Sequence, residues 1–71
     1  MMKMRLEDAI VYVLATTGRG MPTVRIAEII NEQRLHVRSD LRPVSDRQIY
    51  AVVMRKPSIF TKEGAIIHLL M

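Results

Sequence analysis

Residues 43–57 read Pro43-Val44-Ser45-Asp46-Arg47-Gln48-Ile49-Tyr50-Ala51-Val52-Val53-Met54-Arg55-Lys56-Pro57, a stretch that predicts a helix marked at both ends. Ser45 followed three residues later by Gln48 forms a capping box, in which each side chain bonds to the other residue's backbone N–H. Pro57 cannot continue a helix, and it disfavours helical backbone at Lys56. The sequence therefore predicts a helix over residues 46–56.

The predicted helix has two different faces. Ile49, Val52 and Val53 recur at helical spacing, with Lys56 in line with them, and this pattern indicates the face toward the core. The opposite face carries Arg47, Tyr50, Ala51, Met54 and Arg55. A face with two arginines, an aromatic residue and a small residue fits a DNA major groove. It is equally typical of a solvated surface helix.

Two further helices are predicted before this one. An apolar stripe predicts the first over residues 4–16, with Gly18 as a left-handed cap; its members are Leu6, Ala9, Ile10, Val13 and Leu14. Residues 21–23 are expected to be a short extended segment. A second helix is predicted over residues 24–34 with Thr23 as its N-cap; its core face carries Ile26, Ile29 and Ile30. Residues 35–43 are expected to connect it to the third helix and to pack on the core through Leu35, Val37 and Leu41.

The last part of the chain predicts a β-hairpin. Its strands are expected over residues 58–62 and 65–70, with Glu63-Gly64 between them and with Phe60, Ile67 and Leu69 facing inward. Because a lone hairpin is unstable, residues 21–23 are expected to add a third strand. This order of elements predicts a single α+β domain over residues 1–71. The fold is a winged helix, a three-helix bundle with a C-terminal β-hairpin wing and a small three-stranded sheet.

The residue composition argues against several function classes. The 71 residues contain no cysteine, so neither a disulfide nor a thiolate metal site is expected. His36 and His68 are far apart and have no carboxylate at ligand spacing. No glycine-rich phosphate loop or Ser/His/Asp constellation is present. We therefore expect a protein that is not an enzyme and that has no metal and no cofactor.

Membrane insertion is not expected either. Glu7 and Asp8 precede a short apolar run ending at Ala15, which is too acidic and too short for a signal peptide. No stretch has the length of a transmembrane span. The lack of cysteine fits a cytoplasmic protein, and we expect that location.

Arginine dominates the positive charge. The net charge of +4 comes from 11 Lys and Arg residues against 7 Asp and Glu residues, and eight of the 11 are arginine. The guanidinium group bonds phosphates bidentately, which favours a nucleic-acid partner. Many small cytoplasmic proteins carry the same charge without such a partner.

Packing and turn residues along nearly the whole chain carry a resemblance to a known family. They are Leu6-Glu7-Asp8-Ala9-Ile10, Pro22-Thr23-Val24-Arg25-Ile26-Ala27-Glu28-Ile29-Ile30, Pro43-Val44-Ser45, Pro57-Ser58-Ile59-Phe60, and Gly64 leading to Leu69. The chain resembles the HARE-HTH winged-helix domain of chromatin proteins, restriction endonucleases and the delta subunit of bacterial RNA polymerase. The resemblance implies that helix 46–56 is a DNA-recognition helix and that the hairpin is its wing.

The resemblance also implies which residues contact DNA: Arg47, Gln48, Tyr50, Ala51 and Arg55 from the helix, and Thr61 and Lys62 from the wing. Arg38 and Arg42, with Lys62, are expected to neutralise phosphates, or else to be part of a solvated loop. We therefore expect a domain that binds double-stranded DNA in transcription or DNA metabolism.

The alternative is a protein-interaction module accessory to a transcription or restriction enzyme. A basic patch continuous over helix 46–56, the connector and the wing would favour DNA. An apolar patch over Tyr50, Met54 and the outer side of the first helix would favour a protein. The sequence leaves the oligomeric state open.

Overall fold

Helix α3 (Asp46–Arg55) begins at the expected capping box in the computed structural model, which describes residues 4–70 of the chain. The Gln48 N–H donates to Ser45 Oγ over 3.3 Å, and Gln48 Oε1 accepts from the Ser45 N–H over 3.0 Å. Lys56 leaves the helical region with φ −125°. The predicted helix is confirmed but is one residue shorter, because the residue before Pro57 disfavours helical backbone.

Helices α1 (Leu6–Thr17) and α2 (Thr23–Gln33) are also confirmed, with shifted ends. Gly18 closes α1 with φ 72°, and its N–H donates to the Leu14 carbonyl over 3.1 Å. The prediction of Thr23 as an N-cap is wrong, since Thr23 is the first helical residue. Pro22 stands at the cap, with the extended φ of −70° that its ring imposes.

The sheet contains β1 (Met21–Pro22), β2 (Phe60–Glu63) and β3 (Ile66–Leu69), in the antiparallel order β1-β3-β2. Residues 21–22 therefore supply the third strand, as predicted. Residues 58–59 are not part of the sheet, because the Ile59 and Phe60 N–H groups both donate to the Lys56 carbonyl. Phe60 and Ile67 are buried and Leu69 is half-buried, so the predicted inward face is confirmed.

The hairpin turn lies one residue later than predicted. Glu63 pairs with Ile66 in the ladder, which leaves Gly64-Ala65 as the turn. Gly64 has φ 61°, the left-handed conformation that this tight connection requires.

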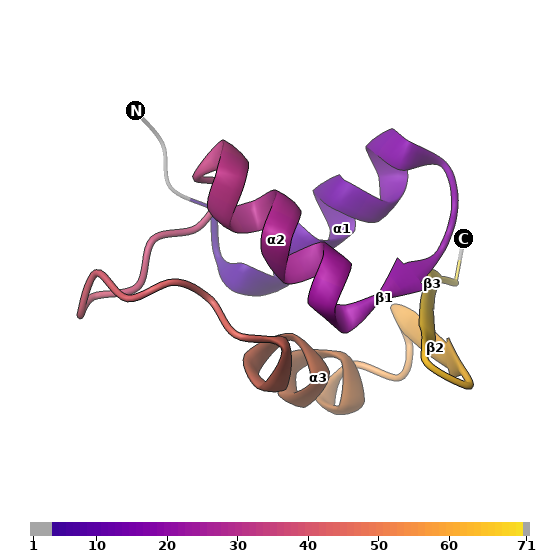
Figure 1. Ribbon diagram of the computed structural model, residues 1–71. Helices are drawn as coiled ribbons and strands as arrows, with labels where there is room; N and C mark the ends of the chain where they lie inside the picture. Colours follow the sequence, from indigo (N-terminus) through magenta and orange to yellow (C-terminus); the bar gives the residue numbers. More distant parts are fainter. Residues whose placement is uncertain (1–3, 71) are drawn as a thin grey trace.

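Together the described residues form the expected α+β winged-helix arrangement. Each element gives at least one large side chain to a shared core, and the fully buried isoleucines are Ile10, Ile26, Ile30, Ile49 and Ile67. Burying one such side chain stabilises a fold by about 1.5–3 kcal/mol. Figure 1 shows that the connector, α3 and the hairpin follow one another along the lower side of the view, below α1 and α2.

The connector between α2 and α3 departs from the prediction at two residues. Leu35 packs against the core, as expected. Val37 is half-buried but is not one of the residues packed against the core. The prediction for Leu41 is wrong, because Leu41 is 81% exposed and has φ 63°. A turn in which the Leu41 N–H donates to the Arg38 carbonyl over 3.0 Å holds Leu41 away from the core.

Leu41→Gly is expected to stabilise the fold. Left-handed backbone costs a residue with a Cβ about 1–2 kcal/mol, and the exposed side chain gives little burial in return. After allowing for the greater freedom of glycine in the unfolded chain, we expect the free energy of unfolding to rise by about 0.5–1 kcal/mol in urea denaturation. Leu41→Ala keeps the Cβ and should change it by less. Equal effects of the two substitutions would contradict this account.

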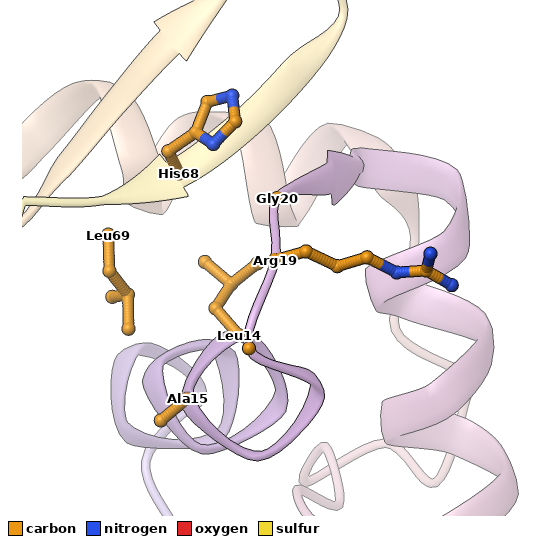
Figure 2. Close-up of a pocket in the computed structure, with 7 residues that line it drawn as sticks. Leu14, Ala15, Arg19, Gly20, His68 and Leu69 are labelled. Carbon is orange, nitrogen blue, oxygen red and sulfur yellow. The ribbon is translucent and has the colours of Figure 1, made fainter.

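Gly20→Ala is expected to destabilise the fold. A Cβ at Gly20 would lie 2.5 Å from His68 Nδ1 and 2.7 Å from the Ile67 carbonyl oxygen; Figure 2 shows the chain at Gly20 passing beside the strand that carries His68. Such overpacking costs about 1–3 kcal/mol, measurable by urea denaturation. Adding His68→Ala should restore only part of the loss, because the backbone contact remains. Full recovery in the double variant would show that the His68 ring alone sets the limit.

Candidate nucleic-acid interface

The outer face of α3 is exposed, as its spacing predicts. Ile49 and Val53 are buried beneath it and Val52 is half-buried. The exposed residues are Arg47, Tyr50, Ala51, Met54 and Arg55. Lys56, expected in line with the core face, is instead exposed, and its Nζ lies 3.8 Å from Glu7 Oε2 of α1.

The Gln48 side chain is occupied by hydrogen bonds within the chain. Its Oε1 accepts from the Ser45 N–H over 3.0 Å and from Arg38 Nη1 over 3.2 Å. Reading an adenine would need both the amide oxygen and the amide nitrogen, and the oxygen already has two donors. Gln48 therefore joins the start of α3 to the connector. The capping spacing reveals the first contact, but no local pattern reveals a partner ten residues away.

Arg38 and Arg42 differ although both belong to the connector. Arg38 Nη2 lies 2.8 Å from Asp40 Oδ2, so its charge is largely balanced within the loop. The Arg42 backbone N–H donates to Asp40 Oδ1 over 3.1 Å, while the Arg42 residue is exposed. The Arg42 guanidinium is therefore more available than that of Arg38 to pair with an anionic partner.

Some cationic side chains are paired with carboxylates and others are not. Arg25 of α2 lies 3.2 Å from Glu28 and 3.8 Å from Glu32. Among residues 4–70, the cationic side chains with no carboxylate at ion-pair distance are Arg5, Arg19, Arg34, Arg42, Arg47, Arg55 and Lys62. Most of these belong to the connector, α3 or the hairpin, which lie on the same side in Figure 1.

Besides Asp40 of the connector, two acidic side chains interrupt this surface. Asp46 is exposed in the first turn of α3, where the helix dipole favours a negative charge. Glu63 is exposed beside Lys62 at the hairpin tip, and its Oε1 lies 3.6 Å from His68 Nε2. The wing therefore adds little net charge to the surface.

Apolar groups share the exposed face of α3. Tyr50 is 45% exposed and Met54 is 55% exposed, and their spacing of four residues makes them neighbours on the helix. Beside Met54 a shallow groove runs to the hairpin, lined by Val53, Met54, Pro57, Phe60, Thr61 and Lys62. The face is thus mixed, with arginines beside a small apolar pair.

A separate hollow lies between the end of α1 and β3 (Figure 2). Its walls include Leu14, Ala15, His68 and Leu69, while the Arg19 side chain points away from His68. Within residues 4–70, no three His, Asp or Glu side chains gather as a metal site. No helix in that same range is long and apolar enough to cross a membrane.

Gln48→Ala is expected to destabilise the fold, in contrast to Arg47→Ala beside it. Loss of Gln48 removes the acceptor for both Ser45 and Arg38, which should lower the free energy of unfolding by about 1–2 kcal/mol. Arg47 is exposed without an ion pair, so its loss should change stability by less than about 0.5 kcal/mol. Urea denaturation of both variants measures the difference. Similar stability of the two would mean that the observed bonds contribute little.

Comparison with known proteins adds no relatives. No family model matches the chain, no curated protein matches it, and no solved structure matches it. The α+β winged-helix arrangement therefore rests on the structure itself. The resemblance to HARE-HTH domains remains a prediction from the sequence.

Proposed function

We propose that this chain is a double-stranded DNA-binding domain that places α3 in the major groove. The observation that carries the proposal is the exposed face of α3, where Arg47 and Arg55 have no carboxylate at ion-pair distance among residues 4–70. Arg42 of the connector and Lys62 of the hairpin flank this face. The sequence resemblance to HARE-HTH domains supports the same role, in transcription or DNA metabolism in the cytoplasm.

Phosphate contacts supply most of the affinity in this proposal. Arg42, Arg47, Arg55 and Lys62 are exposed cations, and each one that neutralises a phosphate releases a condensed counterion. Arg38 contributes less because Asp40 already balances it. The domain acts by binding, without a catalytic step.

Base contacts come from the middle of the exposed face. Where the site offers a guanine, Arg47 can bond bidentately to the base edge in place of a phosphate. Ala51 lies one turn later, and its small side chain allows close approach of the helix. Tyr50 is exposed, and its hydroxyl is a donor suited to a phosphate oxygen. Gln48 positions the start of the helix, since its amide oxygen is occupied.

A second candidate function is docking of a partner protein on the same face. The observation in its favour is the exposed pair Tyr50 and Met54 beside the groove that leads to the hairpin. Aromatic residues and methionine are enriched at protein interfaces. A protein partner would bind there with little dependence on salt, which distinguishes the two functions.

Fluorescence anisotropy of a labelled random duplex, titrated with the chain at several salt concentrations, tests DNA binding. Four phosphate contacts predict that log K falls with log salt at a slope of roughly −3 to −4. Arg47→Ala and Arg55→Ala should each weaken binding and reduce the slope by about 1. Arg25→Ala is the matched control, because the charge of Arg25 is balanced within α2.

No binding at low salt would refute the proposal. An equal loss in the Arg25→Ala control would show that overall charge, and not the α3 face, governs the affinity. In either case the Tyr50 and Met54 pair becomes the leading surface, and Met54→Asp then tests the protein-docking function.

A further inference from the structure

The connector between α2 and α3 borders a hollow that the proposed DNA contacts do not explain. Its walls include Arg34, His36, Val37, Leu41, Arg42 and Pro43. The volume is about 340 Å³, near the lower end of the roughly 300–1,000 Å³ of ligand pockets. In Figure 1 the connector extends outward at the end of α3 opposite the hairpin. The hollow therefore suits a few side chains of a partner and lies at the edge of the α3 face.

The hollow combines two cations with apolar walls. Arg34 and Arg42 are exposed, and neither has a carboxylate at ion-pair distance among the described residues. The carboxylate of the connector itself, Asp40, is occupied by the Arg38 guanidinium and the Arg42 backbone N–H. Val37 and Leu41 provide the apolar surface. A ligand complementary to these walls carries both carboxylates and an apolar side chain.

Hydrogen bonds hold the connector in shape without a ligand. Asn31 Nδ2 donates to the Val44 carbonyl and Asn31 Oδ1 accepts from the Val44 N–H, both over 2.9 Å. At the other side, Arg38 donates to Gln48 over 3.2 Å. A loop that is already ordered loses less conformational entropy when a partner binds.

Backbone strain is concentrated at the same place. Among residues 4–70, the non-glycine residues with positive φ are Arg34, at 52°, and Leu41, at 63°. Both line this hollow. Leu41 is 81% exposed, so packing in the monomer does not compensate the strain. Arg34 takes this conformation as the C-cap of α2, with its N–H donating to the Ile30 and Asn31 carbonyls, so the uncompensated strain is at Leu41. Strained residues of that kind cluster at ligand clamps and switch regions.

We propose that the connector hollow binds a short acidic and apolar segment of a partner protein. Carboxylates of the segment pair with Arg34 and Arg42, and an aliphatic or aromatic side chain packs against Leu41 and Val37. A peptide fits better than a duplex, because the DNA backbone offers anions but no apolar side chain to cover Leu41. The inference does not depend on the proposed function, since Arg34 and Leu41 lie outside the α3 face. Arg42 is shared by the two proposals, so a bound peptide and a duplex would compete for it.

The test is selection of short random peptides displayed on phage against the immobilised full chain. The most enriched peptide is then synthesised and titrated by fluorescence anisotropy. We expect enriched sequences with Asp or Glu around an aliphatic or aromatic residue. Arg34→Asp and Leu41→Asp should each weaken binding about tenfold or more. Aspartate tolerates left-handed backbone, so both variants are expected to fold, which circular dichroism checks.

Matched controls separate the hollow from general effects. Arg19→Asp makes the same charge change at an exposed arginine of the turn between α1 and β1, and Leu70→Asp makes the same polar change at another exposed leucine. Both should bind the peptide as the original chain does. In titrations with duplex DNA, Leu41→Asp and Leu70→Asp should bind with similar affinity.

Three results would overturn the inference. One is selection without enrichment, or with basic or purely apolar peptides. Another is peptide binding that Arg34→Asp and Leu41→Asp leave unchanged. The third is a chain that binds no peptide and whose Leu41→Asp variant loses duplex binding. That result would assign the connector to the DNA interface. Failure of DNA binding alone would leave the peptide result standing.

Discussion

The polar contacts at the start of α3 set the position of every exposed residue on that helix. A helix of 10 residues is marginal by itself in water, and only Ile49 and Val53 are buried on α3. The capping box of Ser45 and Gln48 fixes where the helix begins, and the bond from Arg38 to Gln48 ties that point to the connector. The orientation of Arg47 and Tyr50 therefore depends on a few hydrogen bonds as much as on the core.

The distribution of carboxylates determines which arginines remain for a partner. Glu28 and Glu32 balance Arg25 on α2, and Asp40 balances Arg38 in the connector. The moderate net charge of +4 thus understates the positive character of the connector and of α3. Exposed ion pairs of this kind contribute little to stability, about 0–1 kcal/mol each. Their main effect here is to leave most of the unpaired arginines of residues 4–70 in the connector and α3.

Local interactions explain why much of the fold can be predicted from the sequence. The capping box, the Gly18 cap and the apolar stripe of α1 each involve residues within four positions of one another, so their spacing is sufficient evidence. The exposed face of α3 follows from the same periodicity. The sequence also predicts the hairpin, although the observed turn is shifted by one residue because Glu63 pairs with Ile66.

The sequence predictions fail where contacts between residues far apart in the chain determine the structure. Leu41 belongs to an alternating apolar pattern, yet a turn closed by the Arg38 carbonyl holds it in solvent. The second hydrogen bond of Gln48 comes from Arg38. The backbone of Val44 is held by a hydrogen bond to Asn31, thirteen residues before it. The hollow in the connector likewise requires the three-dimensional path of the loop. Periodicity cannot reveal such contacts, since they do not repeat along the chain.

The short strand β1 has a consequence for how copies of this chain meet. A sheet edge recruits another strand through a row of unpaired N–H and C=O groups. At one edge, β1 is only two residues long, and Pro22 has no N–H to donate. At the other edge, β2 ends in the charged residues Lys62 and Glu63, which oppose close stacking of strands. The sheet is thus protected at both sides against edge-to-edge growth into fibrils.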